Sequence, residues 1–195
     1  MSRLSLTLVC SLGLSVAACD RSGVERAQES TITAPAAGEV DRGMAGEPMP
    51  ALNLSDPQGR VLDIGALEGT PVLLNLWATW CAPCVKEMPQ LDALAARYKD
   101  RLVVVAASQD ARGAEAVEPF FDRAGLANLD PWLDPRNRLM EGLGAEALPL
   151  TILYDADGKE VWRMTGPFDW ASEEASALVE EGFPDLPGSG SVTAE

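Results

Sequence analysis

The amino-acid sequence predicts an α/β fold with a central mixed β-sheet, flanking helices and an extra β-hairpin on the N-terminal side of the domain. Two near-continuous apolar runs, at residues 71–77 and 102–107, have the character of strands covered on both faces. A segment with helical spacing follows each run, and such alternation indicates parallel strands. A hairpin signal stands on either side of this β-α-β-α centre, and the later hairpin adds antiparallel strands.

The N-terminal half of the domain begins with two short predicted strands, at 51–54 and 60–64, around an Asp-Pro-Gln-Gly turn. The run PVLLNLW at 71–77 predicts the first central strand. Apolar residues then recur at helical spacing over 82–99. Pro89 is expected to kink this helix, because proline lacks an N–H group and clashes with the preceding turn.

The second half continues the alternation and ends on a hairpin and a helix. The turn signal Asp-Ala-Asp-Gly marks the hairpin. The predicted elements are a strand at 102–107, a helix at 111–124, a short helix at 136–143 that ends at Gly144, strands at 150–154 and 160–164, and a helix at 169–181.

Composition excludes several function classes. The 195 residues include 15 basic and 30 acidic residues and have a formal charge of −15. Such a surface repels phosphate, so we expect no nucleic-acid partner. Histidine is absent, which excludes Ser–His and Cys–His dyads and any histidine-ligated metal centre. We expect no metal site.

The first 18 residues read as a signal peptide, with Arg3 at the start and a short apolar run that is too short to span a membrane. The run ends in Val-Ala-Ala followed by Cys19, which resembles the lipobox of bacterial lipoproteins. This resemblance implies lipidation of Cys19 and anchoring on the periplasmic side of the inner membrane, for which Asp20 resembles a retention signal. Ordinary cleavage, with Cys19 incidental, is the alternative.

Three segments follow the signal peptide in the predicted organisation. Residues 19–48 contain the lipidated cysteine and a tether without aromatic residues, whose composition predicts flexibility. Residues 49–183 form the folded domain. Residues 184–195 are rich in Gly, Ser and Pro and are expected to form a flexible tail.

The segment Trp-Ala-Thr-Trp-Cys-Ala-Pro-Cys places Cys81 and Cys84 where a strand gives way to a helix. The first N–H groups of a helix have no internal partners and stabilise a thiolate. Cys81 is therefore the expected nucleophile, and Cys84, one turn further on, is the expected resolving cysteine. A structural disulfide is the alternative, although so short a loop constrains a chain weakly. A zinc site would need two more ligands.

WATWCAPC, together with Glu87 and Pro89 in the pattern CxxCxxExP, resembles the TlpA/ResA-like proteins of bacterial envelopes over residues 48–182. The resemblance implies a thioredoxin-like fold and a membrane-anchored, extracytoplasmic thiol–disulfide oxidoreductase. It also implies a cis-proline opposite the dithiol, for which Leu148-Pro149 is the match. In many relatives Thr or a similar small residue follows this proline directly, whereas here Leu150 stands before Thr151.

The resemblance assigns catalytic roles to Cys81, Cys84, Glu87 and Pro149. Glu87 would move protons to and from Cys84, and burial would raise its pKa; a solvated carboxylate near a helix N-terminus is the alternative. Substrate contacts are expected from Trp80, Ala82, Pro83 and Leu148. The only redox group expected is the Cys81–Cys84 disulfide itself, without a further cofactor.

Reduction of protein disulfides is the expected direction, in cytochrome c maturation or copper-centre assembly of oxidases. Ala82-Pro83 lacks the histidine of strongly oxidising relatives, which favours a potential of roughly −250 mV over one of about −120 mV. Apocytochrome c or copper-centre proteins would be substrates, and a membrane thiol transporter of the DsbD/CcdA type would supply electrons. The alternatives are a disulfide isomerase or oxidase, and a Cu(I)-binding assembly factor. A thiol peroxidase is disfavoured because Leu74 and Ala78 stand where its Pro and Thr/Ser belong.

Overall fold

A computed structural model describes residues 38–183 of the chain. Its single mixed sheet has the strand order β1-β8-β7-β4-β5-β6-β2-β3. In chain order the elements are β1 (Val40–Asp41), β2 (Asn53–Ser55), β3 (Val61–Asp63), the short 3-10 helix η1 (Ile64–Ala66), β4 (Val72–Trp77), α1 (Ala82–Arg97), β5 (Val103–Ser108), α2 (Ala114–Ala124), β6 (Trp132–Leu133), α3 (Arg138–Leu143), β7 (Leu150–Tyr154), β8 (Glu160–Thr165) and α4 (Glu173–Glu180).

The centre of the sheet is β4, every residue of which is buried. It runs parallel to β5 and antiparallel to β7, with Trp77 opposite Ser108 and Leu76 opposite Leu150. Helices on both faces explain why the apolar run of β4 lacks the alternation of a half-exposed strand. The predicted mixed α/β sheet is confirmed, as is the N-terminal hairpin, which β2 and β3 form.

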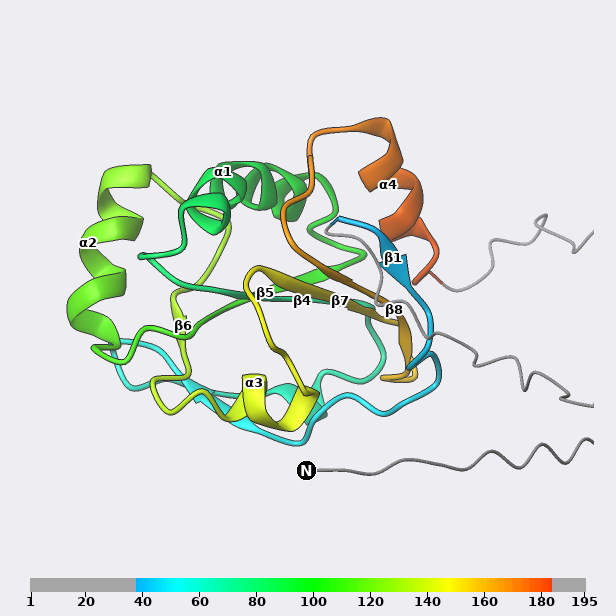
Figure 1. Ribbon diagram of the computed structural model, residues 1–195, viewed down its shortest axis with the longest axis horizontal. Helices are drawn as coiled ribbons and strands as arrows, with labels where there is room; N and C mark the ends of the chain where they lie inside the picture. The colour runs from blue at the N-terminus through cyan, green and yellow to red at the C-terminus, as the bar shows by residue number, and fades with distance from the viewer. Residues whose placement is uncertain (1–37, 184–195) are drawn as a thin grey trace, which may run out of the picture. The chain divides into compact units, whose positions relative to one another are not determined.

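The helices form layers on both sides of the sheet. Figure 1 shows α1 and α4 over one face and α3 over the opposite face. Alternate residues of β4 separate the two cores: Leu73 and Trp77 face α1, whereas Leu74 and Leu76 face α3. This arrangement fixes the start of α1 beside the end of β4.

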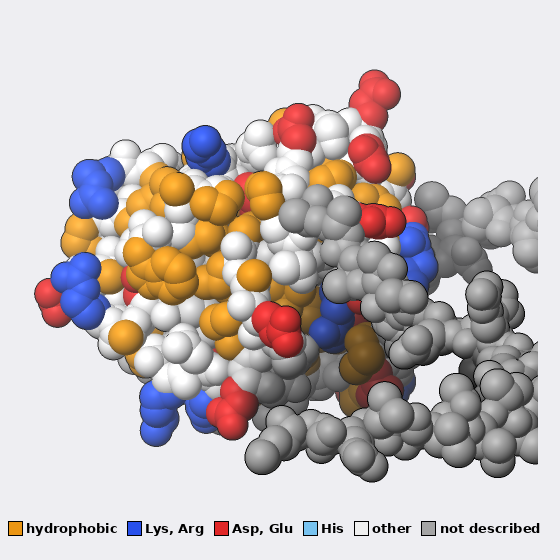
Figure 2. Space-filling view, viewed as in Figure 1, with side chains coloured by type: hydrophobic (Ala, Val, Ile, Leu, Met, Phe, Trp, Pro, Cys, Tyr) orange, Lys and Arg blue, Asp and Glu red, His pale blue; other side chains and the backbone are white. Residues whose placement is uncertain are grey.

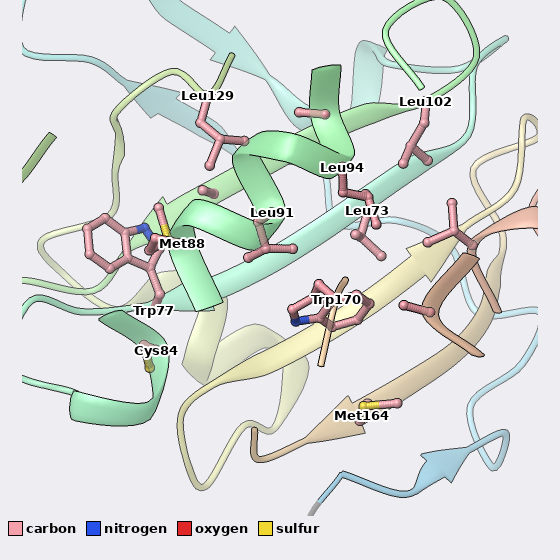
Figure 3. Packing of buried hydrophobic residues seen from close by; sticks show 14 of the residues in the cluster. Leu73, Trp77, Cys84, Met88, Leu91, Leu94, Leu102, Leu129, Met164 and Trp170 are labelled. Atoms are coloured by element: carbon pink, nitrogen blue, oxygen red, sulfur yellow. The ribbon is translucent and has the colours of Figure 1, made fainter. Parts of the chain in front are cut away.

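The core under α1 is continuous with the start of that helix. Figure 3 shows Met88, Leu91 and Leu94 on the inner side of α1, above β4, with Cys84 one turn before Met88. Met88 and Leu91 are fully buried. Helical spacing therefore places Cys84 on the same buried stripe, so the helix that anchors the core also holds the cysteine pair.

Two helix details bear on the sequence-based expectations. Pro89 lies inside α1, yet the helix continues to Arg97; the Pro89 side chain is exposed, so its ring enters none of the packed core. The short helix α3 ends as predicted, with Gly144 in the left-handed conformation at φ 64°.

The folded domain starts earlier than the sequence predicts. The expected tether was 19–48, but Val40 and Asp41 pair with Met164 and Arg163 of β8. Pro48 forms a further β-bridge with Lys159, the residue before β8. Backbone pairing does not depend on side-chain hydrophobicity, which is why the apolar-poor composition of this segment concealed it. The boundary predicted at residue 49 is therefore wrong for the segment from residue 40.

One strand was not predicted, and some predicted segments lie outside the described residues. The short strand β6 was not predicted, because two apolar residues give no periodic signal. The signal peptide, Cys19 and the predicted tail at 184–195 lie outside the described residues. Within residues 38–183, no helix is long and apolar enough to cross a membrane.

Candidate active site

Cys81 and Cys84 form a disulfide at the start of α1, with their Cα atoms 5.3 Å apart. Cys81 is the N-cap residue of the helix, and its sulfur accepts a hydrogen bond from the backbone N–H of Cys84 at 3.4 Å. After reduction the same amide would face the Cys81 thiolate, whose charge it would stabilise. Cys81 is 6% exposed and Cys84 is 1% exposed, so the outer sulfur is the one a partner can reach.

An apolar surface surrounds this disulfide. Trp80, the residue before Cys81, is 69% exposed, which is unusual for so large an apolar side chain. A groove of about 450 Å³ lies at the start of the helix, where Pro83, Pro167 and Phe168 contribute to its lining. Figure 2 shows hydrophobic side chains gathered on the face that includes α1. An exposed tryptophan beside an apolar groove is typical of a protein-contact surface.

The Leu148-Pro149 peptide bond is cis, as the resemblance implied. Because Leu150 pairs with Leu76, Pro149 lies next to the end of β4, the strand that leads into the cysteine motif. Leu148 packs against the cluster that contains Cys81 and Cys84. The hydrogen bonds within residues 38–183 leave the backbone groups of Leu148 unengaged, which suits pairing with an extended peptide.

Glu87 is buried one turn beyond Cys84, with 4% of its surface exposed. Burial raises the pKa of this carboxyl from its ordinary value of 4.5 to about 7; a hydrogen bond from the Phe168 N–H and the nearby Trp170 indole oppose the rise. The Phe168 bond is 2.6 Å long. The second oxygen of Glu87 and the Trp170 indole nitrogen are both buried, and neither makes a hydrogen bond. The carboxyl can therefore exchange a proton near neutral pH.

A second side chain of α1 holds the same neighbouring loop. Gln90 accepts a hydrogen bond from the Trp170 N–H at 3.1 Å and donates one to Asp169 at 3.0 Å. Glu87 and Gln90, one turn apart, thus accept hydrogen bonds from the backbone N–H groups of Phe168 and Trp170 in the loop between β8 and α4. This loop supplies Pro167 and Phe168 to the groove, so the groove wall is fixed to the helix that carries the cysteines.

The structure brings most of the predicted site residues together. Cys81, Cys84 and Glu87 share the first turns of α1, while Ala82 and Pro83 line the groove. Sequence reasoning did not identify Gln90 or the loop at 166–171, because the contact spans about 80 residues of chain. It also missed Asp110, two residues after the end of β5, because the contact of Asp110 with Thr79 spans 31 residues of chain.

Comparison with known proteins agrees with this geometry. The Redoxin family model matches residues 44–179. The thiol-disulfide oxidoreductase ResA of Bacillus thuringiensis is 33% identical over 121 residues, which are 62% of this chain and 69% of the relative. ResA of Bacillus subtilis is 29% identical over 161 residues, which are 83% of this chain and 80% of the relative.

Solved structures give the same result. A crystal structure from Chlorobium tepidum, assigned as a thiol:disulfide interchange protein DsbE, superposes with a TM-score of 0.65 at 26% identity, over 71% of this chain and 96% of the other. The sheet with the cysteine motif at the start of α1 is thus a thioredoxin-like fold. The chain belongs to the Redoxin family, and within it to the ResA-like thiol–disulfide oxidoreductases.

Proposed function

We propose that this oxidoreductase reduces disulfides of extracytoplasmic proteins through Cys81 and Cys84. The observation that carries the proposal is the position of Cys81, whose sulfur caps α1 and accepts the Cys84 N–H while remaining the more exposed of the pair. The exposed Trp80 precedes it, and a mainly apolar groove lies at the start of the same helix. These features suit a thiolate that attacks a disulfide in a bound protein segment.

The reaction proceeds in two exchanges. The Cys81 thiolate attacks one sulfur of the substrate disulfide, which forms a mixed disulfide and releases the other substrate sulfur as a thiolate. Cys84 loses its proton and attacks the Cys81 sulfur, which forms the Cys81–Cys84 disulfide and releases the second substrate thiolate. Two electrons pass to the substrate, and two protons are taken up by its thiolates.

Glu87 serves the second exchange as a proton acceptor. It lies one turn from Cys84, and its buried carboxyl has a pKa of about 7. As a carboxylate it accepts the proton of Cys84, and as an acid it returns a proton to a departing thiolate. The unpaired carboxyl oxygen is the atom available for this transfer.

The biological setting in this proposal follows from the leader and the motif. Lipidation of Cys19 would hold the protein on the periplasmic side of the inner membrane. Ala82 and Pro83 place no cationic or histidine side chain between the cysteines, which favours a reducing potential. In an oxidising compartment a membrane thiol donor of the DsbD/CcdA type must then restore the dithiol. Apocytochrome c and copper-centre assembly proteins are the proposed substrates.

Insulin reduction with dithiothreitol as electron source tests the activity. The wild-type protein should accelerate precipitation of the insulin B chain, and Cys81→Ser should abolish the acceleration. Cys84→Ser should trap substrates as mixed disulfides on Cys81, which mass spectrometry of membrane extracts would identify. If substrates were instead trapped on Cys84 in the Cys81→Ser variant, the assigned roles would be reversed.

The competing functions give different results in companion assays. An isomerase would restore activity to ribonuclease with scrambled disulfides. An oxidase, in its disulfide form, would form the disulfides of reduced ribonuclease without another oxidant. A Cu(I)-binding factor would bind the metal tightly in an anaerobic titration, through the two thiolates. Insulin reduction without any of these activities supports the reductase; loss of insulin reduction in the wild type refutes it.

A further inference from the structure

Asp110 is a buried carboxylate placed against the turn that leads into the cysteine motif. It is 4% exposed. One oxygen accepts hydrogen bonds from the Thr79 N–H at 2.9 Å and the Ser108 hydroxyl at 2.8 Å, and the other accepts from the Thr79 hydroxyl at 2.7 Å. Every partner donates, so the cluster accommodates a negatively charged carboxylate.

Among residues 38–183, no Lys or Arg forms an ion pair with Asp110. The ion pairs formed within residues 38–183 involve other acidic residues, among them Asp56 with Arg60 and Glu160 with Arg163. A buried charge without an opposite partner retains a stronger field than a charge in an ion pair, because little water screens it. The charge of Asp110 is therefore available to act on nearby groups.

The sheet brings this charge close to Cys81. Trp77 of β4 lies opposite Ser108 of β5, and the Gln109 N–H extends the pairing with a 2.8 Å bond to the Trp77 carbonyl. The chain beyond β5 therefore runs beside the turn beyond β4. Thr79, held at both its N–H and its hydroxyl by Asp110, stands two residues before Cys81, and a 3.1 Å bond from the Cys81 N–H to the Ala78 carbonyl closes the turn.

We propose that Asp110 is a positioning residue that fixes the Ala78–Trp80 turn, and that its charge disfavours the Cys81 thiolate and so makes the protein a stronger reductant. The inference rests on the proposed function and adds a determinant of it outside the CxxC motif. A nearby negative charge raises the free energy of a thiolate. Destabilising the reduced form shifts the equilibrium toward the disulfide, which means that electrons are given up more readily.

Two further properties of the site follow from this placement. The helix start stabilises the thiolate while Asp110 opposes it, so the thiol acidity reflects a balance between the two. Trp80, which is exposed beside the nucleophile, is held in place through its neighbour Thr79. The groove at the start of α1 is lined by three charged side chains, Lys86 and Glu87 on α1 and Asp169 from the loop after β8; they stay the same in the comparison below.

Asp110→Asn in the full chain removes the charge of this side chain but keeps its shape. The amide keeps the size of the side chain: its oxygen can accept from the Thr79 N–H and Ser108, and its nitrogen can donate to the Thr79 hydroxyl. In a Cys84→Ser background, alkylation by iodoacetamide across pH reports the Cys81 thiol. Removal of the Asp110 charge should lower the pKa of the Cys81 thiol by about one unit. With both cysteines present, the equilibrium with glutathione should shift about tenfold toward the dithiol.

Two control variants separate the effect of the Asp110 charge from the effect of its hydrogen bonds to Thr79 and from a general loss of stability. Thr79→Val removes the hydroxyl contact but keeps the charge, so the Cys81 titration should stay at the wild-type value. Asp56→Asn neutralises an equally buried aspartate, 4% exposed, in the β2–β3 turn, and should also leave the titration unchanged. Asp110→Ser provides a second neutral variant should the asparagine variant not fold, and the same downward shift is expected.

The outcomes discriminate between the two proposals. The role of the Asp110 charge is overturned if the Cys81 thiol of the neutral variants has the wild-type pKa. It is also overturned if Thr79→Val shifts this pKa as much as Asp110→Asn does. Neither result affects the proposed function, provided that the wild type reduces insulin. If the wild type reduces no disulfide, the proposed function is refuted, whatever the Cys81 titration shows.

Discussion

Glu87 is a carboxyl in a place where the charged form is costly. Its pKa is raised from 4.5 to about 7 by burial, so between these pH values the folded protein holds a proton that the unfolded chain has lost. The stability associated with this group is therefore present at low pH and is lost as pH rises toward 7. Such a destabilised carboxylate beside a resolving cysteine is typical of a functional group.

Glu87→Gln is expected to slow the resolving step and stabilise the fold at the same time. Without a proton acceptor for Cys84, the rate of mixed-disulfide resolution at pH 8 should fall on the order of 100-fold. The rise in rate through pH 7 should disappear from the stopped-flow profile. The neutral amide can still accept the Phe168 N–H, so the free energy of unfolding at pH 8 should increase by up to about 3 kcal/mol.

The two readouts separate a functional from a structural role. A wild-type pH–rate profile in Glu87→Gln would show that the carboxyl takes no part in the exchange. A loss of stability at pH 8 would contradict the inferred cost of its ionisation.

Residue roles differ in how far sequence alone could assign them. Cys81, Cys84 and Glu87 lie within seven residues, so local helical spacing places them together. Gln90 and Asp110 act on segments that only the folded sheet brings near, the loop at 166–171 and the turn before Cys81. No local pattern distinguishes these two from solvated polar residues.

Among the elements, α1 does more than present the cysteines. Its Asp92 accepts hydrogen bonds from the N–H groups of Ala127, Asn128 and Leu129 at 3.0, 2.7 and 3.1 Å. One carboxylate thereby satisfies three consecutive amides of the loop after α2. Hydrogen bonds to charged groups contribute more than neutral ones, so Asp92 ties the α2–β6 connection to the helix at a point remote from the dithiol.

Asp92→Ala should lower the free energy of unfolding by about 2 kcal/mol, because the three amides lose their common acceptor. Insulin reduction at 25 °C should stay at the wild-type rate. Urea denaturation measures the first effect, with Asp122→Ala, on the exposed side of α2, as the control that should change stability by less than about 0.5 kcal/mol. Equal losses in both variants would contradict a specific role for the Asp92 cluster.

Elements were predictable where the chain gives a strong periodic or apolar signal. The buried runs became β4 and β5, and the helical spacing became α1. The strands β1 and β6 have two residues each, and they exist because a longer neighbour offers free backbone groups. Tertiary pairing of this kind leaves no pattern in the strand itself.

For the domain as a whole, the segment at 38–48 completes one edge of the sheet. The Gly46 N–H bonds to the Glu160 carbonyl at 2.8 Å, and the Glu160 N–H bonds to the Glu47 carbonyl at 2.9 Å. Arg42 makes a two-pronged contact with Glu181 at 2.9 and 2.6 Å, which is exposed and contributes little. Without this segment β8 would become an open edge strand.

Two truncations test where the stable domain begins. A chain that starts at residue 38 should match the full protein in urea denaturation. A chain that starts at residue 49 loses the backbone bonds to β8 and should unfold with about 3 kcal/mol less free energy, and its exposed edge should promote association in analytical ultracentrifugation. Equal stability of the two truncated chains would show that the segment adds nothing to the fold.

At this scale the acidic composition and the layered α/β order were readable from the sequence, because both are sums over many residues. The position of the domain boundary was not, because it depends on a few backbone hydrogen bonds of a polar segment. The same holds for the groove beside the dithiol, whose wall comes from the far end of the chain.

A redox titration of the Cys81–Cys84 pair against glutathione most directly tests whether the helix start holds a reducing dithiol. Reversible interconversion with a midpoint of roughly −250 mV is expected, close to that of thioredoxin. A midpoint above about −150 mV would identify an oxidant, and failure of the two sulfurs to interconvert would show that the disulfide is only structural.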